Sequence, residues 1–389
     1  MRSSVRRLAR ARRNPPPRGS IMPRSNLSFL AAFLACACAT QPQPRAQRPA
    51  LSAVATACIT DFDTLYSIVT RDYSGYEDRM RENGRRIALV ADSVRKAIRT
   101  VTTDSACTAT ITRWTALFRE HDHHFQFWQP RQEAPAPPTS SSAPAADPRR
   151  PTIQFIDDST AVITVRDLNR RYKPAIDSLI DTNRTRLLAT PYLVVDFRRN
   201  GGGATAAYRS IMEVIYTDPI AREGFDVWIS PRTIAAARPY LDAPDVDSAM
   251  KAEMRAAIQR YETTGKPFFH EGKAGDVRYD SVYAMPRAVA VLTDRGCASS
   301  CEQFVIDAMY SKKVMVFGTE ATAGMLDYGN IAYTTLPSGL RRLGTATTRS
   351  RRLPARPMDK TGVVPQVLIP KDEPDPIRFA IDHIKRASS

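Results

Sequence analysis

Two short apolar segments, each ending in small residues, constrain the fold of this chain more than any other feature. The first, residues 192–203, ends in Asn200-Gly-Gly-Gly203, and the second, residues 289–302, ends in Cys297-Ala-Ser-Ser-Cys-Glu302. Each begins with a run of valine and leucine that predicts a buried strand, and each leads into a helical pattern. If the two strands are neighbours, the amides of a glycine turn lie beside serine hydroxyls. A hydroxyl nucleophile beside an oxyanion cradle is the minimum that acyl transfer requires.

The sequence pattern predicts a helical N-terminal region and a core of strands and helices, separated by a linker. Helical periodicity over residues 51–129 predicts a small helical N-terminal region. Residues 130–151 are rich in proline, alanine and serine, and such a segment buries too little apolar surface to order itself, so we expect a linker. Over residues 152–389 strands alternate with helices, which predicts an α/β core with a partly parallel sheet.

The N-terminus resembles an export signal. Residues 1–39 combine arginines, a short apolar run and a small-residue cleavage pattern, with Met22 as an alternative start, and residues 40–50 form a polar tether. The apolar run is too short to span a bilayer. Cys36 closes a weak lipobox, which leaves membrane attachment through an N-terminal lipid open. We expect an exported protein of the periplasm or cell envelope.

The positive charge does not indicate nucleic-acid binding. The formal net charge is +16, but eight arginines fall within the first 24 residues and account for half of it. The remaining arginines are scattered, and no basic stripe with interleaved aromatic residues occurs. We therefore expect no nucleic-acid partner.

Cysteine usage is consistent with export. Beyond the signal there are four cysteines, Cys58, Cys107, Cys297 and Cys301, which allow three pairings. A Cys58–Cys107 bridge would join two helices of the N-terminal region. Cys297 and Cys301 flank the serine pair, and free buried thiols remain the alternative. Without a CxxC motif, structural zinc bound by cysteines is not expected.

The serine and glycine segments each allow a structural and a functional interpretation. Ser299 and Glu302 fit a capping box at a helix start, and the same geometry directs a serine nucleophile towards the positive end of the helix. The glycines form a tight turn or an amide cradle, with Gly201 and Gly202 as donors. A phosphate loop and a dinucleotide fingerprint are excluded by spacing.

A histidine cluster supplies candidates for a general base. His121, His123 and His124 lie together, and the alternatives are a surface cluster, a metal site or a base for Ser299, with His124 favoured. No further residue with helical ligand spacing follows, so we expect no metal and no cofactor.

Four blocks in order resemble the tail-specific, or C-terminal-processing, serine peptidases. They cover residues 196–203, 298–302, 318–330 and 357–365. The resemblance implies a Clp-protease/crotonase-like core, a peptide or protein substrate, Ser299 as nucleophile, and an oxyanion hole that includes the Ser300 amide. The lysine base of the bacterial processing enzymes falls at Gly324, and there is no room for their PDZ domain.

The tricorn-like branch of this family uses a histidine instead. Asp122-His-His-Phe125 resembles its Asp-Gly-His-Thr segment, which implies His124 as the base, with His123 as the alternative. Asp359 is then the orienting carboxylate, and Asp327 is its rival. We expect an exported serine peptidase whose residues 218–285 shape a substrate channel. The alternatives are a non-catalytic carrier of peptide tails or hydrophobic ligands and, against the export signal, an acyl-CoA enzyme.

Overall fold

The computed structural model describes residues 51–120, 122–130, 147–244, 246, 248–272, 274–359 and 361–388. By its contacts the chain divides into Met1–Pro49 and Ala50–Ser389, and all described residues belong to the second unit. The expected signal, tether and Cys36, most of the expected linker, and His121 lie outside the described residues.

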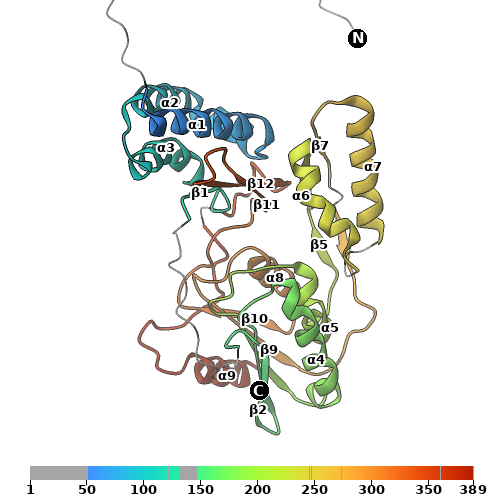
Figure 1. The fold of residues 1–389 in the computed structure, drawn as a ribbon. Helices are drawn as coiled ribbons and strands as arrows, with labels where there is room; N and C mark the ends of the chain where they lie inside the picture. The colour runs from blue at the N-terminus through green and yellow to red at the C-terminus, as the bar shows by residue number, and fades with distance from the viewer. Residues whose placement is uncertain are drawn as a thin grey trace, which may run out of the picture. The chain divides into compact units, whose positions relative to one another are not determined.

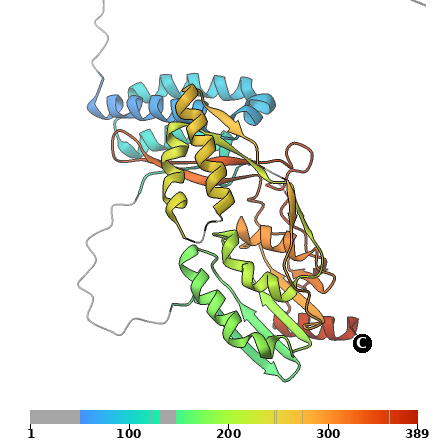
Figure 2. The same cartoon turned by 90° about the vertical axis from the view of Figure 1, so that its right-hand side faces the viewer.

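The second unit alternates helices and strands after a helical start (Figures 1 and 2). The helices are α1 (Ala53–Asp72), α2 (Tyr76–Ala97), α3 (Asp104–Arg119), α4 (Lys173–Leu187), α5 (Arg209–Ile215), α6 (Pro231–Asp242), α7 (Ser248–Thr264), α8 (Ser300–Ala308) and α9 (Pro376–Ala387). The strands are β1 (Gln126–Trp128), β2 (Thr152–Asp157), β3 (Thr160–Thr164), β4 (Tyr192–Asp196), β5 (Ile220–Arg222), β6 (Phe225–Ile229), β7 (Phe268–His270), β8 (Gly275–Val277), β9 (Ala288–Thr293), β10 (Val314–Gly318), β11 (Tyr328–Thr335), β12 (Arg342–Ser350) and β13 (Val367–Leu368).

A six-stranded sheet with the order β13-β10-β9-β4-β3-β2 forms the centre of the core. Its strands pair in parallel except for β2, which runs antiparallel to β3. The apolar side chains of β4 and β9 are buried on both faces, as their continuous runs predict. One face packs against α4, α5 and α8 and the other against α9. Because Asp196 pairs with Leu292, β4 and β9 end at the same edge, which confirms that the two segments are neighbours.

A second, antiparallel sheet lies against the N-terminal helices. It has the order β1-β12-β6-β7, and β11 also pairs with β12. Residues of α1, α2 and α3 share one hydrophobic cluster with Tyr328, Leu343 and Ala346 of the β11–β12 hairpin. The helices therefore have no core independent of the hairpin.

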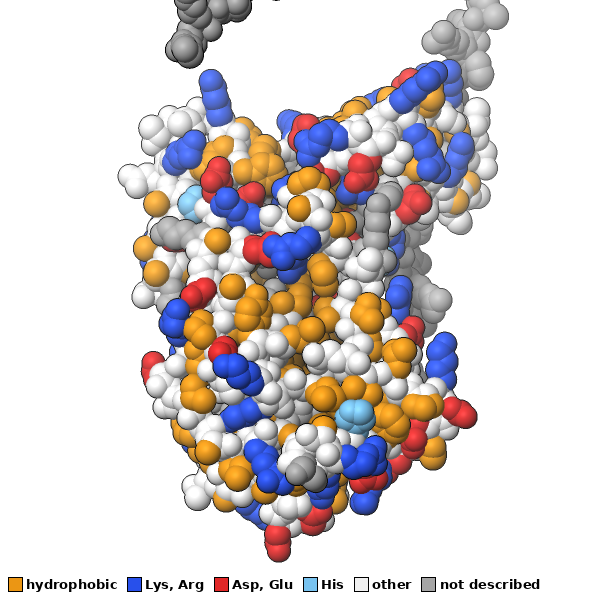
Figure 3. Space-filling model, turned by 180° about the vertical axis from the view of Figure 1, so that it is seen from behind, with side chains coloured by type: hydrophobic (Ala, Val, Ile, Leu, Met, Phe, Trp, Pro, Cys, Tyr) orange, Lys and Arg blue, Asp and Glu red, His pale blue; other side chains and the backbone are white. Residues whose placement is uncertain are grey.

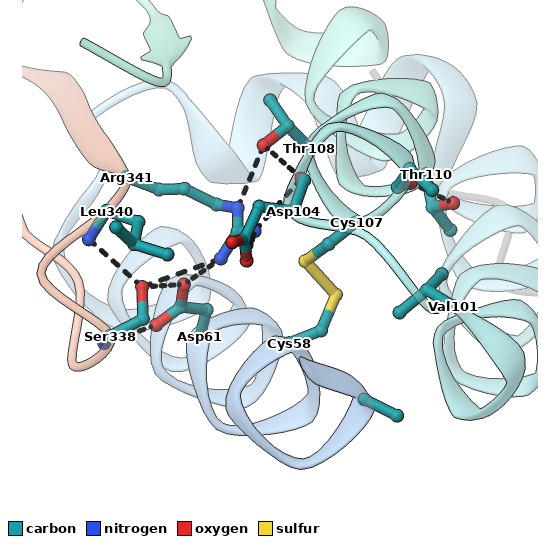
Figure 4. The surroundings of a disulfide bond; sticks show 12 residues. Cys58, Asp61, Val101, Asp104, Cys107, Thr108, Thr110, Ser338, Leu340 and Arg341 are labelled. Carbon is teal, nitrogen blue, oxygen red and sulfur yellow. Dashed lines mark hydrogen bonds and ion pairs between the residues drawn. A yellow bond between two sulfur atoms is a disulfide. The ribbon is translucent and has the colours of Figure 1, made fainter. Parts of the chain in front are cut away.

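A buried ion pair fastens the hairpin end to these helices, next to a disulfide that joins two of the helices to each other (Figure 4). The guanidinium of Arg341, fully buried, lies 2.8 Å from a carboxylate oxygen of Asp61 and 3.0 Å from one of Asp104. Beside it, Cys58 and Cys107 form a disulfide between α1 and α3. This is the pairing that the sequence suggested for the two helices.

Residues between β5 and β8 form a smaller layer with its own apolar cluster. β5 pairs antiparallel with β8, and α6, α7, β6 and β7 lie between them in sequence. The cluster includes Ile229, Ile234 and Ile258. β6 pairs with β12, so this layer is joined to the second sheet.

On the face drawn in Figure 3, Lys and Arg side chains are interspersed with Asp and Glu side chains around apolar ones, and no large patch of one charge appears.

In the part of the chain that the structure describes, every helix is too short or too polar to cross a lipid bilayer.

Candidate active site

The loops that follow β4 and β9 are tied together by backbone hydrogen bonds. The Ala298 amide donates to the Asn200 carbonyl at 3.0 Å. One carboxylate oxygen of Asp294 accepts from the amides of Arg199, at 2.8 Å, and Gly296, at 2.9 Å. The glycine turn and the serine pair, about 100 residues apart in sequence, therefore meet at one edge of the sheet.

The glycine turn is shaped by the buried Asn200. Its side-chain amide donates to the Val165 carbonyl at 3.0 Å, and its side-chain oxygen accepts from the Gly202 amide at 2.9 Å. Gly202 has φ 91°, and a Cβ there would lie 2.5 Å from the Ala298 carbonyl oxygen and 3.0 Å from the Ser300 nitrogen. Only glycine allows the turn to approach the serine pair this closely.

Asp196 anchors the start of this turn. Its buried carboxylate pairs with Arg166 at 2.7 Å and Arg198 at 2.8 Å. Burial alone would raise the pKa of Asp196, but the hydrogen bonds from Arg198 and Arg166 hold that pKa below its ordinary value. The charge is thus compensated locally, and Asp196 has a structural role.

Ser299 occupies the N-cap of α8 with φ 56° and ψ −118°, and its side chain is half-buried. Its amide donates to the Glu302 carboxylate at 2.9 Å, which is one half of the capping box predicted from the sequence. The fully buried Glu302 also accepts from the Met325 amide at 2.8 Å, the Gly324 amide at 2.7 Å and the Thr322 hydroxyl at 2.6 Å. A single carboxylate therefore fixes the nucleophile candidate and the loop before β11.

The expected oxyanion donors differ in their availability. Ser300 is the first residue of α8, where an amide has no intrahelical partner. Among the described residues, the amides of Ser300 and Gly201 have no hydrogen-bond partner, whereas the Gly202 amide is engaged by Asn200. The Ser300 hydroxyl donates to the Gly203 carbonyl at 2.7 Å, which holds α8 against the turn.

Cys297 and Cys301 form a disulfide on either side of this serine pair. Both are fully buried. The alternative of free thiols therefore does not apply to either cysteine.

His124 lies in the interior, in the loop between α3 and β1. It is 7% exposed, its amide donates to Asp122 at 2.7 Å, and its Nδ1 has no hydrogen-bond partner. Burial lowers the pKa of His124, while a hydrogen bond with the Tyr328 backbone and the Glu302 carboxylate act in the opposite direction. Glu302, whose carboxylate holds the Ser299 amide, is thus one of the charges that act on the imidazole of His124. His123 is half-buried.

Asp327 and Asp359 form an interlocked pair. Asp359 accepts from the amides of Leu326 and Asp327, each at 2.7 Å, and Asp327 accepts from those of Met358, at 2.7 Å, and Asp359, at 2.9 Å. The second oxygen of each carboxyl group is buried without a partner. Burial, with the neighbouring Asp327 charge, raises the pKa of Asp359 to about 8.

Asp122 adds a third carboxyl group to this cluster. Its pKa is raised by burial to about 6, and its charge also acts on Asp359. Its second oxygen, like His124 Nδ1, is buried and unpaired. Among the described residues, no group of three His, Cys, Asp or Glu side chains is arranged to hold a metal ion.

Residues 159–369, more than half of the chain, match peptidase family S41. The chain belongs to this family. It is therefore a member of a serine peptidase family that acts on peptide or protein substrates, as the four sequence blocks suggested.

Solved structures show the same fold at low sequence identity. Mature CPAF complexed with lactacystin has a TM-score of 0.58 and 10% identity, covering 86% of this chain and 98% of its own. A lipoprotein from Streptococcus agalactiae has a TM-score of 0.50 and 13% identity, covering 85% of this chain and 97% of its own. No curated protein matches the chain. The predicted fold class, an α/β core of the Clp-protease/crotonase type with a helical N-terminal region, is confirmed.

This S41 peptidase has no room for a lysine at the position of the processing-enzyme base. Gly324 has φ 73°, and a Cβ there would lie 2.9 Å from the Asp359 carbonyl oxygen and 3.0 Å from that of Met358. Lys312 pairs with Asp218 at 2.9 Å, and Lys313 donates to the Tyr283 carbonyl. Neither lysine is directed by these contacts to Ser299.

The sequence indicated Glu302 as a helix cap and as the last residue of the block 298–302, and it did not reveal the four bonds that this side chain accepts. Asp122 was noted only as part of the histidine segment, and nothing in its neighbours along the chain shows that it lies close to Asp359.

Proposed function

We propose that this S41 peptidase is an exported enzyme that hydrolyses peptide bonds with Ser299 as nucleophile and His124 as general base. The observation that carries the proposal is that His124 is buried and that its pKa responds to the charge of Glu302, the carboxylate that holds the Ser299 amide. A neutral imidazole is the form that accepts a proton, and burial favours it.

In the proposed mechanism, the Ser299 hydroxyl attacks the substrate carbonyl while His124 takes its proton. The amides of Ser300 and Gly201 donate to the tetrahedral oxyanion, and the positive end of α8 adds to this stabilisation. Gly202 contributes if its amide turns away from Asn200 when substrate binds. The protonated imidazole then donates to the leaving amine, and water hydrolyses the acyl-enzyme by the same route.

Asp359 is the proposed orienting carboxyl group, with Asp327 as its rival. At neutral pH a group with a pKa of about 8 holds a proton. The imidazolium that forms during attack would stabilise the ionised carboxylate, so the imidazole and the carboxyl group titrate as a coupled pair. Asp359 Oδ2 and His124 Nδ1 are each buried without a hydrogen-bond partner, and the proposal pairs these two atoms.

Export is supported by the two disulfides, because such bonds persist in oxidising compartments. The signal over residues 1–39 and a lipid at Cys36 remain part of this proposal, which fractionation of the full-length chain and mass spectrometry of its mature N-terminus would test.

The catalytic assignment is tested with Ser299→Ala, His124→Ala and the matched control His123→Ala on casein and a peptide panel. We expect the first two to lose hydrolysis and the control to keep it, and we expect a fluorophosphonate to label Ser299 in the wild type. Undiminished hydrolysis by Ser299→Ala would refute the assignment. A folded wild type that neither labels nor hydrolyses would favour the non-catalytic carrier, which the absence of a lysine at Gly324 motivates.

A further inference from the structure

The backbone of Ser299 is held in a conformation that side-chain-bearing residues rarely adopt. Its φ of 56° lies in the left-handed region, with ψ at −118°. Such strain persists only where the surrounding structure holds it in place. The position of the hydroxyl therefore depends on whatever fixes the residues just before and just after Ser299.

Several contacts fix the loop before the serine. The Cys297 amide donates to the Asp294 carbonyl at 3.0 Å, and the Cys297 carbonyl accepts from the Ala323 amide at 2.9 Å. Ala298 is bound to the glycine turn through the Asn200 carbonyl. The backbone on the N-terminal side of Ser299 is thus joined to both neighbouring loops.

The helix side of the serine is fixed by the core. Cys301 lies in the first turn of α8, and its amide donates to the Ala298 carbonyl at 3.0 Å. Its sulfur belongs to the same fully buried cluster as Phe304 and Val305. The Cys297–Cys301 disulfide joins these two sides covalently, so Ser299 and Ser300 lie within a closed ring of backbone and sulfur.

We propose that the Cys297–Cys301 disulfide is a positioning device for the nucleophile, which holds the Ser299 hydroxyl and the Ser300 amide in their reactive arrangement. This inference rests on the proposed function of Ser299. The disulfide touches no substrate and acts through the two serines that it encloses. Without it, the turn can relax towards ordinary helix-start dihedrals and move the hydroxyl away from the imidazole.

The sequence separations of the two disulfides distinguish this role from that of a fold staple. Cys297 and Cys301 are 4 residues apart, whereas Cys58 and Cys107 are 49 apart. In the chain-entropy model, a cross-link restricts the unfolded chain less when the loop it closes is shorter. The short disulfide should therefore contribute less to global stability than the long one, although it lies next to the nucleophile.

The test compares Cys297→Ala/Cys301→Ala with the matched control Cys58→Ala/Cys107→Ala in the full chain. We expect the first variant to lose about 100-fold in kcat, since a displacement near 1 Å has that effect, with KM nearly unchanged. Fluorophosphonate labelling of Ser299 should slow in proportion. The control should keep the wild-type kcat while its melting temperature falls further than that of the first variant.

A second variant, Cys297→Ala/Cys301→Val, fills part of the buried volume that the sulfur atoms leave. It separates the loss of the covalent bond from the effect of a cavity. The inference is overturned if either folded variant keeps kcat within about threefold of the wild type. It is equally overturned if both variants fail to fold, because the disulfide would then act as a fold staple. Failure of the proposed function looks different, since the wild type itself would then show no labelling at Ser299.

Discussion

Replacing Glu302 with glutamine tests the claim that one buried carboxylate organises the site. In the wild type, one oxygen accepts from the Ser299 and Met325 amides, and the other accepts from the Gly324 amide and the Thr322 hydroxyl. A glutamine side chain has one accepting oxygen and one donating amino group. Either orientation therefore sets the amino group against two donors.

The less costly orientation directs the amino group at Thr322 and Gly324. The Thr322 hydroxyl can rotate, but its oxygen already accepts from the Val363 amide at 2.7 Å, and the Gly324 amide loses its acceptor altogether. Losing a hydrogen bond to a charged acceptor costs about 1.5–3 kcal/mol, and an unpaired buried donor costs about 1–3 kcal/mol. We expect Glu302→Gln to lower the free energy of unfolding by about 3–5 kcal/mol.

Urea denaturation followed by tryptophan fluorescence measures this change. Glu320→Gln is the matched control. Glu320 lies exposed in the loop before β11, to which Glu302 is hydrogen-bonded, and its substitution should change stability by less than about 0.5 kcal/mol. Removing the Glu302 charge also removes an interaction that raises the pKa of His124, so the acid limb of the pH–rate profile should move to lower pH. Stability of Glu302→Gln within about 1 kcal/mol of the wild type would refute the reasoning.

Three further predictions concern stability. Arg341→Met leaves the fully buried Asp61 without its ion-pair partner, with only the hydrogen bonds from Ser338, and should cost about 3–5 kcal/mol in urea denaturation. The exposed Arg342→Met should cost far less, and equal effects would contradict the burial argument. Gly324→Ala should lower the free energy of unfolding by about 2–5 kcal/mol, because φ is 73° and the new Cβ would lie 2.9 Å from the Asp359 carbonyl oxygen. Gly339→Ala, with φ 74° and open space around the Cβ, should cost about 1–2 kcal/mol. A cost at Gly324 no larger than at Gly339 would show that the contact with Asp359 is harmless. The pKa of Asp359 is about 8 in the folded chain, and an unfolded aspartate has a pKa of about 3.9. Between these two pH values, the carboxyl group is protonated in the folded state and ionised in the unfolded state. As the pH rises from about 4 to 8, the free energy of unfolding should therefore fall more steeply in the wild type than in Asp359→Asn. Parallel profiles of the two proteins would contradict the raised pKa.

The sequence predicted those features that depend on neighbours along the chain. The apolar runs predicted the strands β4 and β9. The small residues that end these runs predicted the glycine turn after β4 and the N-cap of α8. Helical periodicity gave α1, α2 and α3. These succeed because periodicity and capping are local properties.

Features that depend on distant contacts could not be predicted in this way. The engagement of the Gly202 amide follows from the rotamer of Asn200, and no spacing reveals a rotamer. The interlocking of Asp327 with Asp359 requires two loops 32 residues apart to exchange hydrogen bonds with each other's backbone. In the sequence Arg341 is one of the scattered arginines, yet it is buried because Asp61, 280 positions earlier, compensates its charge.

The cluster shared by the N-terminal helices and the β11–β12 hairpin limits how this protein can be recombined. A chimera that exchanged only the first 120 residues with those of a relative would bring a foreign apolar surface against Tyr328 and Leu343, and it would separate Arg341 from the acids that match it. The helices and the hairpin should therefore be inherited and exchanged together, although more than 200 residues lie between them in the gene product.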